Sequence, residues 1–480
     1  MKSWLFLCCI YFAQNMQAAE SDPFNSREES NHQITLLNHG LGSFEARLQM
    51  IEKAQKSIDV EYFIYNLDKS GRIFTQALIK RANEGVKIRI LLDYFMAKSE
   101  NELNPFLANE LEKSGIEVKY FNTTSTLNLF SGQRRNHRKL LLIDSNEAIT
   151  GGRNLGDEYF DLVDDFNFLD RDLQVSGPIA QHIQSTFDQF WNSKLSVKIE
   201  REKKPEPPFS SGENELSDRM DYEREIRDYN LRISAAKNFL TIPEALYETI
   251  REHGKNQLAL AYRGNCSNMS INTDYATIDK KAPRITKNNL AERIRNARES
   301  ILFDSTYFIV DNEFKNALET ALENKVKVSL LTNSIYSSDA IYVVTAFDSI
   351  IRSWILKGLE PHIFKGILPE DYPTMTNKIS NGRFGIHAKS FVFDNKDVVI
   401  GTFNFDPRSA NLNNEMTISC DNNPELARYV SEDIERRMRG SILLDSTKKA
   451  DDFQFYKAGF FKKMGYYILK YPSILFDYLL

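Results

Sequence analysis

The sequence HRKLLLID at residues 137–144 is followed by GGRN at 151–154, and the arrangement returns as HAKSFVFD at 387–394 with GTFN at 401–404. Each copy places a histidine, a lysine, an aspartate, a glycine and an asparagine at the same spacing. A single strand with the pattern His-x-Lys is usually a solvated sheet edge. Two complete copies that agree at five residue types indicate a functional duplication instead.

The apolar runs 140–143 and 391–393 after each histidine predict buried strands. Residues two apart on a strand share a face, so each histidine should lie beside the lysine of its own motif. The pairs are His137 with Lys139 and His387 with Lys389. Imidazole, ammonium and amide groups gathered in this way could bind a phosphate, supply a nucleophile and protonate a leaving group.

A tight turn follows each strand and should bring Asn154 and Asn404 back beside the histidines. The turn residues are Gly151, Gly152, Gly401 and Thr402. Asp144 and Asp394 lie five residues past the lysines, and this odd spacing puts them on the opposite strand face. We therefore expect these two aspartates to have structural roles.

These motifs resemble the signature of the phospholipase D superfamily, His-x-Lys-(x)4-Asp followed by Gly-Ser/Gly-x-Asn. The blocks GGRNLGDEYF at 151–160 and NFDPRS at 404–409 are similar to the bacterial cardiolipin synthase-like branch. The similarity covers most of residues 40–475. It implies an α/β fold of two phospholipase D-like α/β/α lobes in one chain, with the motifs meeting at the lobe interface.

The resemblance also implies a reaction through a phosphohistidine. His137 would be the nucleophile and His387 the acid and base, although the near-equivalent motifs leave the reverse order open. An unperturbed histidine pKa near ~6.5 would let one ring be neutral and one charged. The groups expected to hold the phosphoryl oxygens are Lys139, Lys389, Asn154 and Asn404. Neither a metal nor a cofactor is expected, because the lysines supply the positive charge.

Each histidine needs an acceptor that fixes its tautomer. Asp172 and Glu415 both open an apolar-alternating strand after the asparagine turn, where the family has carboxylates. We expect Asp172 beside His137 and Glu415 beside His387.

Similar segments at 48–66 and 293–311 extend the duplication, and strands alternating with helices predict mostly parallel sheets. We divide the chain into a leader-like segment (1–19), a first domain (30–200), a linker rich in charge and proline (201–225), a second domain (226–450) and an aromatic-basic tail (451–480).

Composition restricts the partners. The net charge of −5 argues against a nucleic-acid enzyme, which usually carries basic excess.

Residues 1–19 combine Lys2, an apolar run and small residues, which is typical of a secretory signal peptide. An uncleaved peripheral segment and acylation at Cys8 or Cys9 are the alternatives. Cys266 and Cys420 could form one disulfide in an exported protein, but the sequence does not test this pairing.

The tail after Phe453 mixes aromatic residues with lysines, which suits a membrane interface as well as it suits packing on the second lobe.

The leading functional hypothesis is a membrane-associated, exported phospholipid phosphodiesterase or phosphatidyltransferase with water or an alcohol as acceptor. Water would give phosphatidic acid, and phosphatidylglycerol would give cardiolipin. The alternatives are a nucleic-acid phosphodiesterase and a non-catalytic membrane-binding protein.

Overall fold

The computed structural model describes residues 22–99, 110–124, 132–198, 203–208, 215–279, 281–445 and 458–469. The leader-like segment at 1–19 lies outside these residues, as does most of the tail.

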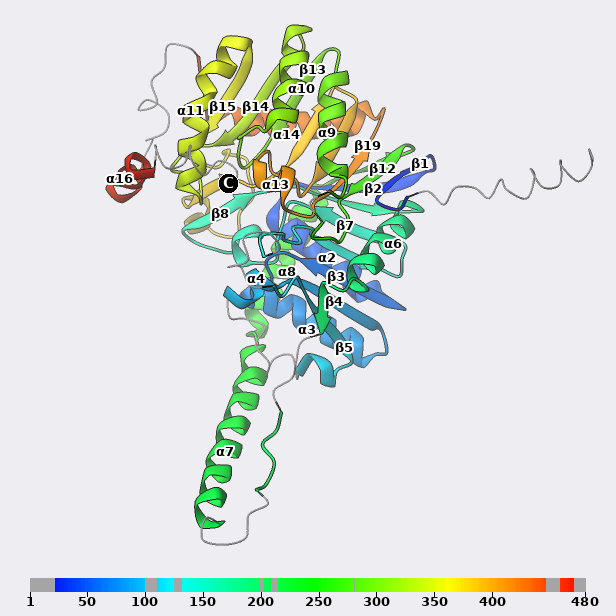
Figure 1. Ribbon diagram of the computed structural model, residues 1–480, viewed down its shortest axis with the longest axis vertical. Helices are drawn as coiled ribbons and strands as arrows, with labels where there is room; N and C mark the ends of the chain where they lie inside the picture. The colour runs from blue at the N-terminus through cyan, green and yellow to red at the C-terminus, as the bar shows by residue number, and fades with distance from the viewer. Residues whose placement is uncertain are drawn as a thin grey trace, which may run out of the picture.

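Two nine-stranded sheets form the body of the described chain (Figure 1). The first runs from edge to edge as β10 (Ser196–Lys198), β5 (Ile116–Phe121), β4 (Lys87–Asp93), β3 (Ser57–Tyr62), β6 (Leu140–Ile143), β7 (Glu147–Gly151), β9 (Asp172–Ser176), β2 (His32–Leu37) and β11 (Tyr262–Cys266). The second runs as β20 (Ser441–Leu443), β15 (Leu359–Phe364), β14 (Lys327–Asn333), β13 (Ser300–Asp304), β17 (Ser390–Phe393), β18 (Asp397–Gly401), β19 (Met416–Cys420), β12 (Met269–Thr273) and β1 (Asn25–Glu28). The two orders correspond strand for strand, so the duplication extends to both whole sheets.

The prediction of mostly parallel sheets is wrong. Only β3, β4 and β5, and their counterparts β13, β14 and β15, pair in parallel within the two large sheets. The motif strands form antiparallel hairpins, β6 with β7 and β17 with β18. Asp144 and Ser145 adopt φ angles of 51° and 55° in the connecting turn, and this left-handed geometry is what a tight hairpin requires.

Helices cover the outer face of each sheet and also lie between the sheets. The outer helices are α2 (Gly40–Lys53), α3 (Lys69–Asn83) and α8 (Glu244–Ala259) on the first, and α9 (Ile285–Asn296), α10 (Asn312–Glu323) and α11 (Ile341–Lys357) on the second. Helices α6 (Ile179–Trp191) and α14 (Pro424–Arg439) join both sheets in one shared apolar core. Short helices are α4 (Tyr94–Ser99), η1 (Asp157–Tyr159), α12 (Asn377–Ser380) and α13 (Pro407–Asn411).

Backbone pairing and buried charge connect the lobes. Strand β8 (Phe166–Leu169) of the first lobe pairs in parallel with β16 (Arg383–Ile386) of the second. Next to this pairing, Arg171 of the first lobe contacts Asp304 at 2.9 Å and Asp433 at 2.6 Å, both in the second lobe and all buried. Such a cluster is stable only while every charge keeps its partner, so it fixes how the lobes dock.

The lobes also exchange their outermost strands. Strand β1 precedes the first lobe but pairs with β12 of the second, whereas β11 precedes the second lobe but pairs with β2 of the first. Helix α8 likewise packs on α2. The expectation that residues 226–285 extend the second lobe is therefore wrong for α8 and β11, because the open edge of β2 and the apolar face of α2 are covered by them.

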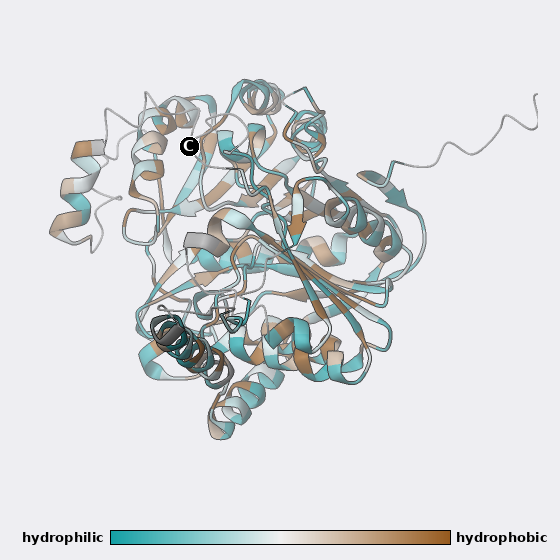
Figure 2. Cartoon of the chain, turned by 60° about the horizontal axis from the view of Figure 1, so that its bottom comes forward, coloured by the Kyte–Doolittle hydropathy of each residue, from teal (hydrophilic) through white to brown (hydrophobic). Residues whose placement is uncertain are grey.

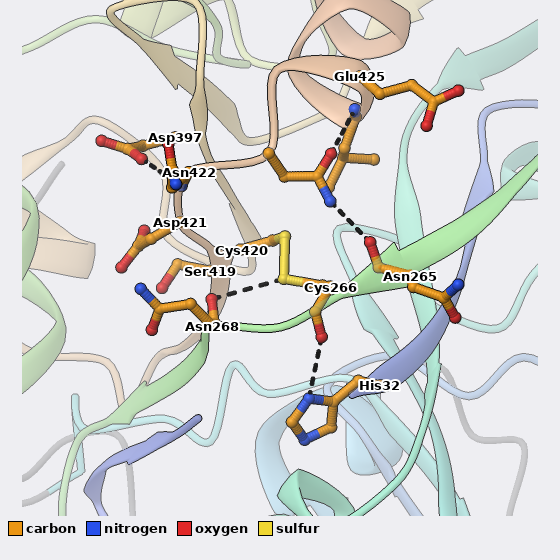
Figure 3. Close-up of a disulfide and its surroundings, with 12 residues drawn as sticks. His32, Asn265, Cys266, Asn268, Asp397, Ser419, Cys420, Asp421, Asn422 and Glu425 are labelled. Atoms are coloured by element: carbon orange, nitrogen blue, oxygen red, sulfur yellow. Dashed lines mark hydrogen bonds between the residues drawn. A yellow bond between two sulfur atoms is a disulfide. The ribbon is translucent and has the colours of Figure 1, made fainter. Parts of the chain in front are cut away.

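A disulfide links Cys266, at the end of β11, to Cys420, at the end of β19 (Figure 3). Since β11 belongs to the first sheet and β19 to the second, this bond is a covalent connection between the lobes. His32 contacts the carbonyl oxygen of Cys266 through Nδ1 at 3.2 Å, on the first-lobe side of the bond.

The expected linker is partly helical. Helix α7 (Glu215–Phe239) projects away from the body (Figure 1) and most of its side chains are exposed. The last described helix, α16 (Phe460–Leu469), lies beside α11. No helix within the described ranges has the length and apolar character needed to cross a membrane.

Candidate active site

Both motif histidines lie at the seam between the lobes. His137 precedes β6, and its backbone N–H donates to the carbonyl oxygen of Asn414 in the second lobe at 3.0 Å. His387 follows β16, and its N–H donates to Leu169 in the first lobe at 2.8 Å. The two residues are 6% and 7% exposed, so both imidazoles are almost completely buried.

Each imidazole is held by a carboxylate from the opposite lobe. His137 Nδ1 lies 2.9 Å from Glu415 Oε2, and His387 Nδ1 lies 2.5 Å from Asp170 Oδ2. An ionised carboxylate accepts a hydrogen bond from Nδ1–H, so in the neutral ring Nε2 keeps its lone pair. This crossed arrangement gives two pseudo-equivalent carboxylate–histidine pairs, and neither is complete within one lobe.

The structure corrects both expected carboxylate assignments. Asp172 does not face His137, and Glu415 pairs with His137 rather than with His387. In the sheet register Asp172 lies opposite Gly151, and its counterpart opposite Gly401 is Thr417. The true equivalent of Glu415 is therefore Asp170, two residues earlier.

Asp172 instead belongs to a buried structural network. Its Oδ2 accepts from Ser43 Oγ at 2.7 Å and pairs with Arg47 at 3.0 Å and Arg153 at 3.1 Å. Two guanidinium groups with no access to water need this carboxylate, so its contacts stabilise the fold of the first lobe.

The lysines lie beside the histidines of their own motifs, as the strand spacing predicts. Lys139 Nζ donates to the carbonyl oxygen of His137 at 2.7 Å, and Lys389 Nζ donates to that of His387 and to Thr306 Oγ1 at 3.1 Å. Both ammonium groups are almost completely buried.

The asparagines of the two motifs differ in their contacts. Asn154 Nδ2 donates to the Tyr159 hydroxyl at 2.8 Å, and its Oδ1 accepts from the backbone N–H of Ile64 at 3.3 Å. The buried Oδ1 of Asn404 has no hydrogen-bond partner among the described residues.

The two orienting carboxylates are supported differently. Glu415 accepts from the hydroxyls of Thr402 and Ser409 at 2.5 and 2.7 Å and from Asn413 Nδ2 at 3.1 Å. At the first-motif counterpart of Thr402 stands Gly152, where a Cβ would lie 2.0 Å from Asp170 Oδ1. Gly152 therefore leaves the space that Asp170 occupies.

Burial dominates the electrostatics of the basic groups. It lowers the pKa of His137 to about 4, with Glu415 opposing this effect and Lys139 adding to it. The pKa of His387 is also lowered, by burial and then by Lys389. Both rings therefore favour the neutral form more than a free imidazole does, because burial leaves them little contact with water, and this acts against the expected charge on one ring.

The pKa values of the two lysines and of the two orienting carboxylates are also lowered. Burial lowers the pKa of Lys139 to about 7 and also lowers that of Lys389. Burial would raise the pKa of Glu415, but His137 and Lys139 lower it to about 2. Burial acts in the same direction on Asp170, yet His387 and Lys389 hold its pKa well below the usual range. When both rings are neutral and both lysines are protonated, the two ammonium groups balance the charges of the two carboxylates.

Asp144 and Asp394 lie away from this site, where they accept backbone N–H groups at the start of the neighbouring strands. Asp144 accepts from residues 55–57 at 2.7–2.9 Å, and Asp394 accepts from residues 298–300 at 2.7–3.1 Å. These contacts give both aspartates the structural role that their strand parity predicts.

Sequence reasoning missed Asp170 and the aromatic residues around the histidines. The Tyr159 and Phe168 rings lie 5.1 and 4.9 Å from the His387 ring, and the Phe63 ring lies 4.8 Å from that of His137. The strand register that separates Asp170 from Asp172 comes from the structure, and the sequence alone holds no signal for it.

Comparison with known proteins agrees with this geometry. The family model described as "Cardiolipin synthase, PLD-like domain" matches residues 48–191 and 290–438, which include both motifs. The chain belongs to the phospholipase D superfamily. Its place is in the cardiolipin synthase-like branch, and it is a phospholipase D-like enzyme.

Individual relatives cover most of the chain. Cardiolipin synthase C of Escherichia coli is 29% identical, over 79% of this chain and 79% of that protein. An uncharacterized protein of Helicobacter pylori strain J99 is 28% identical, over 85% of this chain and 79% of its own length. The crystal structure of phosphatidylserine synthase from Haemophilus influenzae has a TM-score of 0.61 at 14% identity, covering 93% of this chain and 95% of that one, and it shows that the two-lobed fold is shared.

Proposed function

We propose that this enzyme transfers a phosphatidyl group from a phospholipid to water or an alcohol through a phosphohistidine. The observation that carries the proposal is the crossed pair of carboxylate-bound histidines, each with a buried lysine of its own motif beside it. Phosphatidyl transfer by the relatives named cardiolipin synthase supports the same reaction class here.

In the first half of the proposed cycle, His137 Nε2 attacks phosphorus and forms the P–N bond. The bond to the leaving alkoxide breaks, and His387 donates a proton from Nε2 to that oxygen. In the second half, His387 takes a proton from water or an alcohol, whose oxygen attacks phosphorus and breaks the P–N bond. Lys139, Lys389, Asn154 and Asn404 stabilise the phosphoryl oxygens.

Charge balance provides the proton for this cycle. The free site is near neutrality, so a bound phosphodiester adds one uncompensated negative charge. That charge favours the uptake of one proton by a histidine, which gives the acid for the leaving alcohol. Substrate binding thus offsets the lowered pKa of His387.

Export is the cellular context that we propose. A disulfide between lobes forms and persists in an oxidising compartment, and this agrees with the leader-like residues 1–19. A phospholipid membrane would then be the physical source of substrate, with water, phosphatidylglycerol or another alcohol as acceptor.

Incubation with labelled phosphatidylcholine or phosphatidylglycerol, followed by thin-layer chromatography, tests the proposal. We expect labelled phosphatidic acid, or cardiolipin from phosphatidylglycerol, and neither product from the His137→Ala variant. Cleavage of a DNA control with no change in lipid would favour a nucleic-acid phosphodiesterase, and no turnover of either substrate would favour a non-catalytic role.

A further inference from the structure

One side of helix α16 fastens it to the second lobe. Tyr466 is 1% exposed, and its hydroxyl donates to Asp348 on α11. Lys462 Nζ donates to the carbonyl oxygens of Ile335 at 3.0 Å and Ser338 at 3.1 Å, in the loop before α11. These contacts fix the rotation of α16 about its axis.

The opposite side of α16 is apolar and exposed. Phe460, Phe461, Met464 and Ile468 are 73%, 78%, 44% and 63% exposed. At about 100° per residue these four lie within one ~100° arc, roughly opposite Lys462 and Tyr466. In Figure 2, α16 is the separate helix at the far left, and its ribbon carries brown segments with teal between them. We call these four residues the outer face of α16.

This face is too apolar for an ordinary solvated helix and too exposed for a core helix. Single apolar side chains on a surface are normal, but a contiguous group marks a binding surface. The ten described residues of α16 cover about 15 Å, which is about half of a hydrocarbon layer ~30 Å thick. A short helix with one apolar face and one anchored face suits shallow insertion.

Helix α16 also borders a cleft beside β16, the strand that leads to His387. A cleft of about 680 Å³ lies between its first turn and the start of β16, with Lys462, Tyr336 and Arg383 in its lining. Arg383 lies over the Phe166 ring at 4.1 Å, and it donates to the carbonyl oxygen of Tyr336 at 2.7 Å. Strand β16 begins at Arg383 and runs directly to His387.

We propose that the outer face of α16 docks on the surface of a phospholipid bilayer and so brings this cleft, and the catalytic seam behind it, to the lipid headgroups. The inference rests on the proposed function, since a phosphatidyltransferase must reach lipids that remain in a membrane. Aromatic and aliphatic side chains would enter the interface, while Lys462 and Tyr466 keep α16 attached to the enzyme.

Flotation of the full-length protein with phosphatidylglycerol/phosphatidylcholine vesicles tests this directly. The test variant is Phe460→Ser/Phe461→Ser. The matched control is Leu356→Ser, a 74% exposed leucine on α11 and outside the outer face. We expect about tenfold weaker vesicle binding for the double variant, because two phenylalanine side chains no longer enter the bilayer interface. Binding by the control should be unchanged.

A second readout is the ratio of turnover on vesicles to turnover on monomeric short-chain phosphatidylglycerol. We expect this ratio to fall in the double variant at an unchanged melting temperature. Equal binding by wild type and double variant would overturn the docking proposal. So would a concentration-dependent dimer in sedimentation that the double variant abolishes, because a second copy would then cover the face. Vesicle binding by wild type without any lipid turnover would support docking and refute the proposed function.

Discussion

Two aspartates two residues apart have different tasks in this enzyme, and sequence spacing alone does not separate them. Asp170 faces His387 across the lobe seam, while Asp172 lies between Arg47 and Arg153 inside the first lobe. The sequence identified the histidines, lysines and asparagines because the repeat preserves their spacing. It could not identify Asp170, because Gly151 and Gly401 lie at different chain distances from the strands that pair with them.

Substituting these aspartates separately should give opposite phenotypes. Asp170→Asn removes the carboxylate that holds His387 and can offer an amide N–H to Nδ1, so we expect kcat to fall by about 10²-fold or more at near-normal stability. Asp172→Asn leaves two buried guanidinium groups without their carboxylate and should cost about 3–5 kcal/mol of unfolding free energy. Steady-state kinetics and urea unfolding measure both quantities. Loss of activity in a stable Asp172→Asn protein, with Asp170→Asn active, would reverse the assignment.

The lowered pKa values predict an unusual pH dependence. In the proposed cycle His137 attacks as the neutral ring, and its pKa near 4 keeps it neutral down to about that pH. Lys139 acts as a cation, and its pKa near 7 means that its charge is lost as the pH rises through about 7. We therefore expect kcat/KM on a nitrophenyl phosphodiester, whose leaving group needs no acid, to rise through about pH 4 and fall through about pH 7. A profile that stays flat from pH 6 to 9 would contradict the buried-lysine account.

At the scale of elements, apolar periodicity identified the motif strands, but turn chemistry decided their pairing. The hairpin between β6 and β7 depends on the left-handed conformation of Asp144 and Ser145. Neither residue is a glycine, so the turn signal is weak, and the alternation of strands with helices predicted mostly parallel sheets instead. The side chain of Asp144 compensates by accepting three backbone N–H groups from residues 55–57.

Asp144→Ala should therefore act on stability and not on chemistry. The loss of these accepted hydrogen bonds near the surface should cost about 1–2 kcal/mol of unfolding free energy, with kcat unchanged. The same change at Asp394, its counterpart in the second lobe, provides the matched test. A large fall in kcat at unchanged stability would instead assign these aspartates to catalysis.

For the whole molecule, the repeat predicted two similar lobes but not how they interlock. Exchange of β1 and β11 joins residues more than 200 positions apart, and such non-local pairing leaves no periodic trace in a sequence. The crossed histidine–carboxylate pairs and the Arg171 cluster add polar contacts that work only when the lobes dock in one way.

The Cys266–Cys420 bond should stabilise this docking. Its partners are 154 positions apart, so removing it frees a long loop in the unfolded chain. We expect the Cys266→Ala/Cys420→Ala variant to lose about 2–5 kcal/mol of unfolding free energy while remaining active at 25 °C. Calorimetry of the variant and of reduced wild type should show the same lowered melting temperature. An unchanged melting temperature in both would show that the bond does not hold the lobes.

The central claim is a covalent cycle divided between histidines of the two lobes. The test mixes the His387→Ala variant with a nitrophenyl phosphodiester and stops the reaction without acid, because acid would hydrolyse a P–N bond. Mass spectrometry then measures the mass of the enzyme. The nitrophenolate leaving group needs no acid, whereas the second half of the cycle needs His387 as base. The account predicts a burst of one nitrophenolate per enzyme and a stable phosphoryl adduct on His137. No burst and no adduct in this variant, with the wild type active on the same substrate, would contradict it.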